Sequence, residues 1–313
     1  MEIKYWKIED GIRKEIEDHY RTRLALSLKE QSAIEIVKEI TFDNVAPNLN
    51  VKEVDSLISF VNKNFLEEKL EGVGLEVGAG CGFFSAVFAK EATVKKVYAL
   101  EIVENIVKEL MPKVVESVAG KNSNKVVGCV GEFNNIELPN NSVDFVFDFY
   151  SLHHSNNLEK TFRELFRVLK PGGFVLCFDK ARSNSLSREQ LDGLLDKEYP
   201  REAKINMGID PSAIHTRRMN GEYEYRLKDW EKAFLDSGFN NFYHYHLARM
   251  GSGGVFSRIY KKMISIFPIK LQIFINNLLL RNKKVNNLDV SNVIYTRLVD
   301  NMPKEISLMM VYK

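Results

Sequence analysis

The pattern of hydrophobic and polar positions changes about seventy residues into the chain. Up to that point polar and apolar residues interleave at helical spacing, and VKEVDSLISFVNKNFLEE follows Asn50, a plausible N-cap. From Val73 to Asp179, short runs of Val, Leu and Phe alternate instead with helical patterns. We therefore expect a helical N-terminal segment, residues 1–70, followed by an α/β domain.

Seven apolar runs have the length and composition of β-strands. The first five are nearly continuous in Val, Leu and Phe, which is typical of a parallel sheet covered on both faces. The predicted strands are residues 73–78, 96–101, 125–130, 143–150, 174–179, 242–248 and 305–313. Amphipathic patterns predict helices between them, most clearly over residues 157–170 and 227–239. The fold class is therefore α/β, with a doubly wound, seven-stranded, mostly parallel sheet.

Composition and charge exclude several classes of protein. The chain has 313 residues, of which 45% are hydrophobic and 27% charged, as in a globular protein with a full core. A formal charge of +2 argues against a protein whose main role is to bind nucleic acid. We predict no membrane-spanning helix, because no apolar run reaches roughly 18 residues. The three cysteines form no CxxC pair, so we expect no metal site and a reducing, cytoplasmic location.

The most specific motif is EVGAGCG, which follows the first predicted strand and precedes a helix. Glycines at Gly78, Gly80 and Gly82 permit positive φ angles and let a ligand approach bare backbone. The third glycine comes two residues after the second, whereas in the dinucleotide fingerprint it comes three residues after. Glu76 stands two positions before the first glycine. Taken alone, the motif also fits a tight glycine turn that binds no ligand.

Acidic residues follow the next two predicted strands. Glu101 ends the second strand, where a carboxylate can accept hydrogen bonds from both hydroxyls of a ribose. Gly131, Glu132 and Phe133 follow the third strand. Each position by itself also fits a solvated residue at a strand end, so the argument depends on their order and spacing.

In this order, these elements resemble the class I S-adenosylmethionine-dependent methyltransferases. The SLHH sequence at Ser151–His154 resembles the type 11, or ubiquinone-methyltransferase-like, group, and LKPGGFVL resembles the family's turn into the fifth strand. The resemblance covers roughly residues 70–180 and implies a Rossmann-like methyltransferase fold whose last strand is antiparallel. It implies S-adenosylmethionine as cofactor, with Glu101 at the ribose and Glu132 at the adenine. The cofactor-binding residues that it implies are Glu76, Gly78, Ala79, Gly80, Gly82, Glu101, Ile102, Gly131, Glu132, Phe133, Asp148 and Phe149.

A general base is the second kind of residue to look for. Methyl transfer from a sulfonium needs an aligned acceptor and removal of the acceptor's proton, for which histidine is the usual side chain near neutral pH. The candidate bases at the end of the fourth strand are Asp148, His153 and His154. His215, a further candidate, lies in an insertion over residues 180–226 that covers the acceptor pocket in this fold. We rank His154 first and His215 second. The alternative role for His153 or His154 is a structural hydrogen bond, and the alternative for His215 is a solvated position in a surface loop.

Residues 249–304 form a second insertion, between the last two predicted strands. From Gly251 to Lys284 there are seven Lys or Arg residues and no Asp or Glu. Apolar residues share one helical arc and basic residues the other, so residues 255–284 are a candidate for peripheral contact with an anionic membrane. Because apolar helical faces are usually buried, we expect instead that the helix packs its apolar side on the core.

The predicted organisation is thus a methyltransferase core, a lid and two insertions. The core comprises residues 71–248 and 305–313 and includes the acceptor insertion, whose mixture of polar and aromatic side chains suits a polar ligand. We expect methyl transfer to an oxygen or nitrogen of a small polar molecule, such as a sugar or natural-product intermediate. Two alternatives stay open: a quinone or lipid-linked acceptor at the membrane surface, and a non-catalytic scaffold that binds the cofactor.

Overall fold

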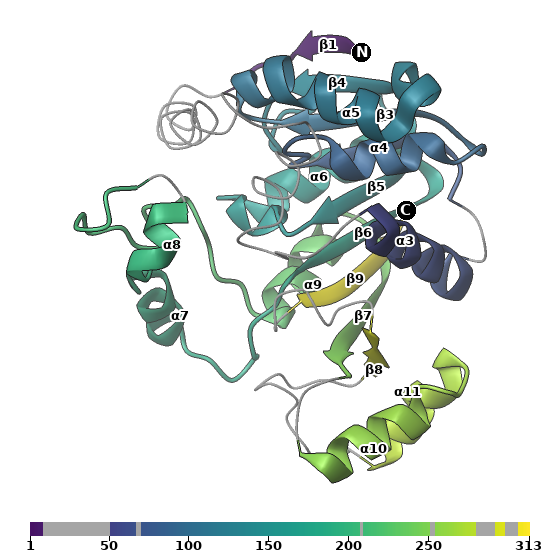
Figure 1. Cartoon of the computed structure of the whole chain (residues 1–313), viewed down its shortest axis with the longest axis vertical. Helices are drawn as coiled ribbons and strands as arrows, with labels where there is room; N and C mark the ends of the chain where they lie inside the picture. Colours follow the sequence, from purple (N-terminus) through teal and green to yellow (C-terminus); the bar gives the residue numbers. More distant parts are fainter. Residues whose placement is uncertain (9–50, 67–69, 207–208, 251–253, 280–291, 298–305) are drawn as a thin grey trace.

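In the computed structural model, one sheet with helices on both faces organises the chain (Figure 1). The strand order is β1-β4-β3-β2-β5-β6-β9-β7-β8. Strands β1 to β6 pair in parallel, and β9 is antiparallel to both β6 and β7. This confirms the predicted doubly wound, mostly parallel sheet. The structure describes residues 1–8, 51–66, 70–206, 209–250, 254–279, 292–297 and 306–313. Residues 9–50 of the predicted lid, which include the predicted N-cap Asn50, lie outside the described residues.

The seven predicted strands are present at the predicted positions. They are β2 (Gly72–Val77), β3 (Val94–Glu101), β4 (Val126–Val130), β5 (Val143–Phe149), β6 (Leu169–Lys180), β7 (Asn240–Arg249) and β9 (Ile306–Tyr312).

Two short edge strands were not predicted, so the sheet has nine strands instead of seven. They are β1 (Glu2–Tyr5), beside β4, and β8 (Val293–Thr296), beside β7. The strand at Glu2–Tyr5 corrects the expectation that the first seventy residues are helical. Each edge strand has only four residues, too few for a periodic signal, and it forms because the neighbouring strand offers unpaired backbone groups.

Helices on both faces of the sheet bury the apolar side chains of the strands. On one face Phe145 and Phe147 of β5 pack with α3 and α4, and on the other Val146 packs with α6 and α9. This alternation follows from the period of two along a strand. The described helices that precede α10 are α3 (Val51–Phe65), α4 (Phe83–Lys90), η2 (Ile106–Leu110), α5 (Met111–Ala119), η3 (Gly120–Lys125), η4 (Leu152–His154), α6 (Leu158–Val168), α7 (Arg188–Leu195), α8 (Arg201–Asn206) and α9 (Leu227–Asp236).

Two further helices, α10 (Val255–Ile264) and α11 (Ile269–Leu279), lie together beyond β8 at one end of the sheet (Figure 1). Their orientation corrects the expectation that the whole apolar side packs on the core: Ile264 is buried against the end of the sheet and Tyr260 is half-buried, but most of the apolar side of α10 is exposed. Phe256 is 90% exposed and Met263 61% exposed, whereas the side chain of Lys261 is buried. None of the helices in the described ranges is long and apolar enough to cross a membrane.

Candidate cofactor and active site

The glycine loop turns at the carboxyl end of β2, between the sheet and α4. Gly78, Gly80 and Gly82 have φ angles of 64°, 52° and 75°, which favour glycine. A Cβ atom at Gly78 would come within 2.3 Å of the Ser151 side chain, whereas a Cβ at Gly80 would meet nothing within 4 Å. Gly78 therefore lets the loop pack against the turn that follows β5, the neighbour of β2 in the sheet. Gly80 leaves open backbone where a ligand can lie.

Glu101 contacts this loop from the end of β3. Its two carboxylate oxygens accept hydrogen bonds from the backbone N–H of Gly80 at 2.9 Å and of Val103 at 3.0 Å. Burial raises the pKa of Glu101, and these hydrogen bonds oppose that shift. A carboxylate has about four acceptor positions, so Glu101 retains capacity for hydroxyl donors beside the glycine loop.

Glu76 lies deeper and holds the loop in place. Its side chain is buried and accepts hydrogen bonds from the backbone N–H of Ser85, at 2.7 Å, and from the Ser85 hydroxyl. Ser85 belongs to the first turn of α4, so Glu76 joins β2 to the start of that helix. Burial raises the pKa of Glu76 to about 8; the hydrogen bonds from Ser85 oppose the shift, and the carboxylates of Asp148 and Glu101 add to it. This geometry favours a positioning role over direct contact with a ligand.

The remaining candidate cofactor residues lie at the same edge of the sheet. The backbone N–H of Gly131 donates to the Glu101 carbonyl at 3.0 Å, and that of Ala79 donates to the Leu100 carbonyl at 2.8 Å. The Phe133 ring lies 3.5 Å from the position of a Cβ on Gly78. The ends of β2, β3 and β4 are thereby joined. At this edge, Ile102 and Phe149 are half-buried and Glu132 is buried.

Asp148 is fully buried beneath the turn that follows β5. Its Oδ1 accepts hydrogen bonds from the Ser151 hydroxyl at 2.5 Å and from the Leu152 N–H at 2.9 Å, and its Oδ2 accepts one from the Cys177 thiol at 3.1 Å. Asp148, Cys177 and Asp179 have potential ligand atoms within 4.8 Å of one another. Hydrogen bonds within the protein already engage these atoms, so the cluster serves to fix the turn and Asp148 is poorly placed to be a base.

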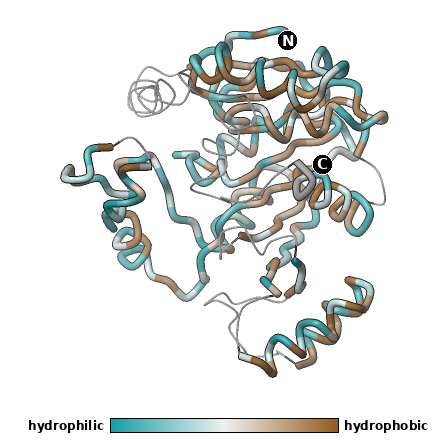
Figure 2. Tube along the Cα trace, in the orientation of Figure 1, coloured by the Kyte–Doolittle hydropathy of each residue, from teal (hydrophilic) through white to brown (hydrophobic). Residues whose placement is uncertain are grey.

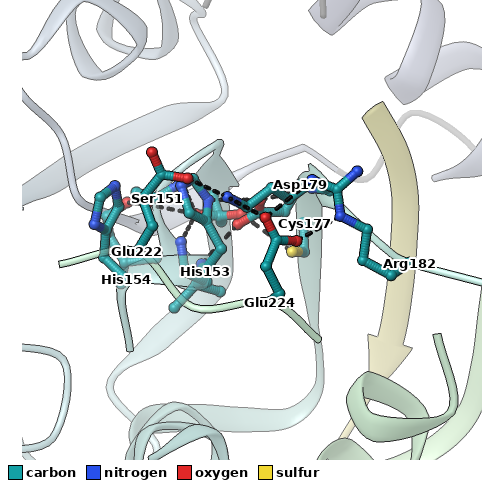
Figure 3. Close-up of polar contacts among 12 residues, drawn as sticks. Ser151, His153, His154, Cys177, Asp179, Arg182, Glu222 and Glu224 are labelled. Carbon is teal, nitrogen blue, oxygen red and sulfur yellow. Dashed lines mark hydrogen bonds and ion pairs between the residues drawn. The ribbon is translucent and has the colours of Figure 1, made fainter. Parts of the chain in front are cut away.

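The candidate histidines His153 and His154 lie together on η4 with their ring centroids 4.3 Å apart (Figure 3). The Nδ1 atom of His153 is 2.8 Å from Asp179 Oδ1, and its backbone N–H donates to Asp179 Oδ2 at 2.9 Å. Burial lowers the pKa of His153 well below its usual range and raises that of Asp179 to about 7. Because His153 is buried, its contacts with Asp179 hold η4 against the end of β6.

His154 is only half-buried and has a defined tautomer. Its Nδ1 lies 3.0 Å from the backbone carbonyl oxygen of Gly221. A carbonyl can only accept, so Nδ1 carries the proton and Nε2 keeps a lone pair. Burial, with a smaller contribution from His153, lowers the pKa of His154 to about 3. The ring is therefore a neutral proton acceptor at physiological pH.

Next to the histidines lies a network of buried charges that the sequence analysis missed (Figure 3). Lys180 lies 2.5 Å from Glu222, and Arg182 donates to Glu224 at 2.5 and 2.9 Å. The two basic residues are two positions apart in the sequence, and so are the two acidic residues. This spacing places the side chains of each set on one face of an extended chain. The two segments run side by side, since the Arg182 N–H donates to the Tyr225 carbonyl at 2.8 Å. The matching KxR and ExE spacings were the signal in the sequence.

The network extends into the acceptor insertion through Arg217 and Tyr199. Arg217 lies 2.7 Å from both Glu222 and Glu224, and the Tyr199 hydroxyl donates to Glu222. Burial would raise the pKa of Glu222, but Lys180 and other nearby cations hold it far below its usual value. His215 stacks on Tyr199 with a centroid distance of 5.9 Å. Its ring contact is thus with the insertion, whereas His153 and His154 lie together on η4.

Comparison with known proteins agrees with this geometry. Residues 75–177 match the family model described as a methyltransferase domain. Residues 75–177 thus form a domain of the class I S-adenosylmethionine-dependent methyltransferase type. The matched residues run from β2 into β6 and include the glycine loop, Glu101 and both η4 histidines. The acceptor insertion and the α10–α11 pair lie outside the matched residues.

Curated relatives resemble the methyltransferase over part of their length. A sterol 24-C-methyltransferase of Aspergillus fumigatus is 30% identical over 88 residues, which are 28% of this chain and 21% of the relative. A demethylmenaquinone methyltransferase of Listeria monocytogenes is 27% identical over 152 residues, 46% of this chain and 62% of the relative. The chain thus spans less than two thirds of either protein.

Solved structures share the fold of this methyltransferase. The phosphoethanolamine N-methyltransferase 2 of Haemonchus contortus, in complex with S-adenosylhomocysteine, has a TM-score of 0.53 at 16% identity over 98% of this chain and 61% of its own. The cyclase SpnF has a TM-score of 0.52 at 13% identity over 100% of this chain and 99% of its own. At these identities the likeness concerns the fold alone.

Proposed function

We propose that this methyltransferase transfers the methyl group of S-adenosylmethionine to an oxygen or nitrogen atom of a small polar molecule. The observation that carries this proposal is the buried charge network beside His154. Lys180 and Glu222 belong to it, and it lies where β5 and β6 end, at the edge of the sheet that also holds the glycine loop and Glu101. Charged and aromatic side chains at a binding site favour a polar acceptor.

The residues at the carboxyl ends of β2, β3 and β4 fit the cofactor. The open backbone at Gly80 can lie against its methionine part, and Glu101 can accept hydrogen bonds from its ribose. Glu132, which is buried after β4, can accept one from its adenine amino group. When bound, the cofactor supplies a methyl group that is already activated by its positive sulfur. The protein must then align the acceptor, exclude water and take up one proton.

His154 is our candidate for the side chain that accepts that proton. The Gly221 carbonyl fixes the ring with its Nε2 lone pair available, and the Asp179–His153 pair holds the turn that bears it. A pKa of about 3 makes His154 a weak base. A weak base suffices for an oxygen acceptor, because a hydroxyl that gains a methyl group becomes an oxonium and strongly acidic during the reaction. A neutral amine attacks through its own lone pair and needs no base in the transfer step; the ammonium product releases its proton to water afterwards. His215 remains the second candidate and Asp148 is best regarded as a positioning residue.

An apolar acceptor, a quinone or a lipid-linked intermediate, is the second candidate function. Two observations favour it. The names of the relatives from Aspergillus fumigatus and Listeria monocytogenes specify a sterol and demethylmenaquinone as their acceptors. The α10–α11 pair also exposes large apolar side chains, which would suit a substrate drawn from a membrane.

A screen of acceptors with isotopically labelled S-adenosylmethionine separates these functions. The full chain would be incubated with a polar panel of sugars and amino-sugars and an apolar panel of quinones and sterols, with products identified by mass spectrometry. We expect labelled product from the polar panel only. Product from the apolar panel only would replace our proposal with the second candidate. Binding of S-adenosylhomocysteine without turnover in either panel would indicate the non-catalytic scaffold.

A further inference from the structure

The outward side of the α10–α11 pair is apolar. Figure 2 shows hydrophobic residues along both helices. Apolar residues at i, i+3 and i+7 of each helix are 41–90% exposed. We call them the outer face: Phe256, Ile259 and Met263 on α10, and Leu271, Phe274 and Leu278 on α11. A contiguous exposed apolar patch on a folded domain marks a contact surface.

Polar side chains fix the helix pair in this orientation. Lys261 Nζ donates to the Arg249 carbonyl at 2.9 Å. Asn276 Nδ2 donates to the Val293 carbonyl at 2.7 Å, and its Oδ1 accepts from the Tyr260 hydroxyl at 2.8 Å. Val293 lies on the edge strand β8, whose backbone groups need partners. Turning the outer face inward would break these bonds and bury unsatisfied polar groups.

The charged residues within the described α10–α11 segment all have one sign. Residues 254–279 contain four basic side chains and no acidic one. Arg258, Lys262 and Lys270 are exposed, and Lys261 is the buried one. A basic rim around an apolar stripe matches a bilayer, since phosphate headgroups attract the cations and acyl chains receive the apolar residues. In a twofold contact between two copies, the like charges of the two rims would lie close together.

We propose that the outer face docks on an anionic lipid bilayer, with its six apolar side chains in the headgroup region and its basic rim at the phosphates. This proposal does not depend on the acceptor or on methyl transfer. It commits to lipid as the occupant, in preference to a second copy of the chain or to a protein partner.

Co-flotation of the full chain with vesicles tests the proposal. Vesicles of phosphatidylcholine mixed with phosphatidylglycerol would be compared with pure phosphatidylcholine. We expect binding to the anionic vesicles that weakens as salt rises. Phe256→Ser should reduce it at least about tenfold, and Lys262→Gln about fivefold. The matched controls are Leu235→Ser and Lys228→Gln, which change exposed side chains of α9, and they should bind like the wild type.

Three results would overturn the proposal. The first is absence of binding to any vesicle by the wild type. The second is equal loss of binding in Leu235→Ser and Phe256→Ser. The third is a wild-type dimer, measured by light scattering without lipid, that Phe256→Ser converts to a monomer, because the outer face would then belong to a second copy. A thermal melt of each variant should match the wild type, since these side chains are exposed.

Discussion

Helices α6 and α10 are both amphipathic, but α6 buries its apolar face whereas α10 exposes most of its own. On α6, Phe162 is fully buried and stacks on Phe234 with their centroids 3.7 Å apart, while the side chain of Arg163 is 64% exposed. On α10, Phe256 is 90% exposed and the Lys261 side chain is buried. The same kind of pattern therefore has two outcomes in one chain.

The difference lies in what each helix packs against. Helix α6 covers the middle of the sheet, where β2, β5 and β6 present apolar side chains, so burial of its apolar face is favourable. Helices α10 and α11 pack at the edge strand β8, where carbonyl groups of the backbone need donors. Periodicity indicates which side of a helix is apolar, and the neighbouring surface decides which side is buried.

Substitution of His154 gives the largest expected effect and separates the two regions by function. If His154 accepts the proton, His154→Ala should lower turnover about a hundred- to ten-thousand-fold with little change in cofactor affinity. Phe256→Ala, in the outer face, should leave turnover of a soluble acceptor unchanged. The measurement is steady-state kinetics with the acceptor found by the screen. Near-normal turnover in His154→Ala would transfer the role to His215 or leave the reaction without a side-chain base.

A pair of matched truncations tests the comparison of the two helices directly. Phe162→Ala removes a buried ring and should lower the free energy of unfolding by about 3–5 kcal/mol. Phe256→Ala should change it by no more than about 0.5 kcal/mol, because the ring is exposed. Urea unfolding of the full chain gives both values. Similar losses in the two variants would mean that α10 buries its apolar side after all.

Most of the fold follows from local pattern, whereas the pairing of charges does not. The central strands and α6 have runs of Val, Leu and Phe at clear periods, so their positions were predictable. The positive φ angles at Gly78 and Gly80 follow from the EVGAGCG motif. By contrast, Lys180 meets Glu222 only because two segments forty residues apart in the sequence lie side by side. Local spacing hints at such contacts but cannot identify the partner.

Titration of Glu76 gives a smaller effect with a defined sign. Its pKa is about 8 in the folded protein against an ordinary value of 4.5, so between these values the folded state holds a proton that the unfolded chain has released. Stability contributed by this group is therefore present below the unfolded pKa and is lost as pH rises toward 8. Between about pH 6 and pH 8 the wild type should lose on the order of 2 kcal/mol relative to Glu76→Gln, which cannot titrate. Urea unfolding at both pH values measures this difference, and parallel stability curves would contradict it.

Calorimetry of cofactor binding tests the central claim most directly. The full chain should bind S-adenosylhomocysteine and should not bind NAD, because the GxGxG loop and Glu101 fit a nucleoside without a pyrophosphate. Glu101→Ala should weaken binding by about 1.5–3 kcal/mol for each hydrogen bond lost, whereas Glu109→Ala, at an exposed position on η2, should bind like the wild type. Tight binding of NAD without any binding of S-adenosylhomocysteine would contradict the assignment of this site.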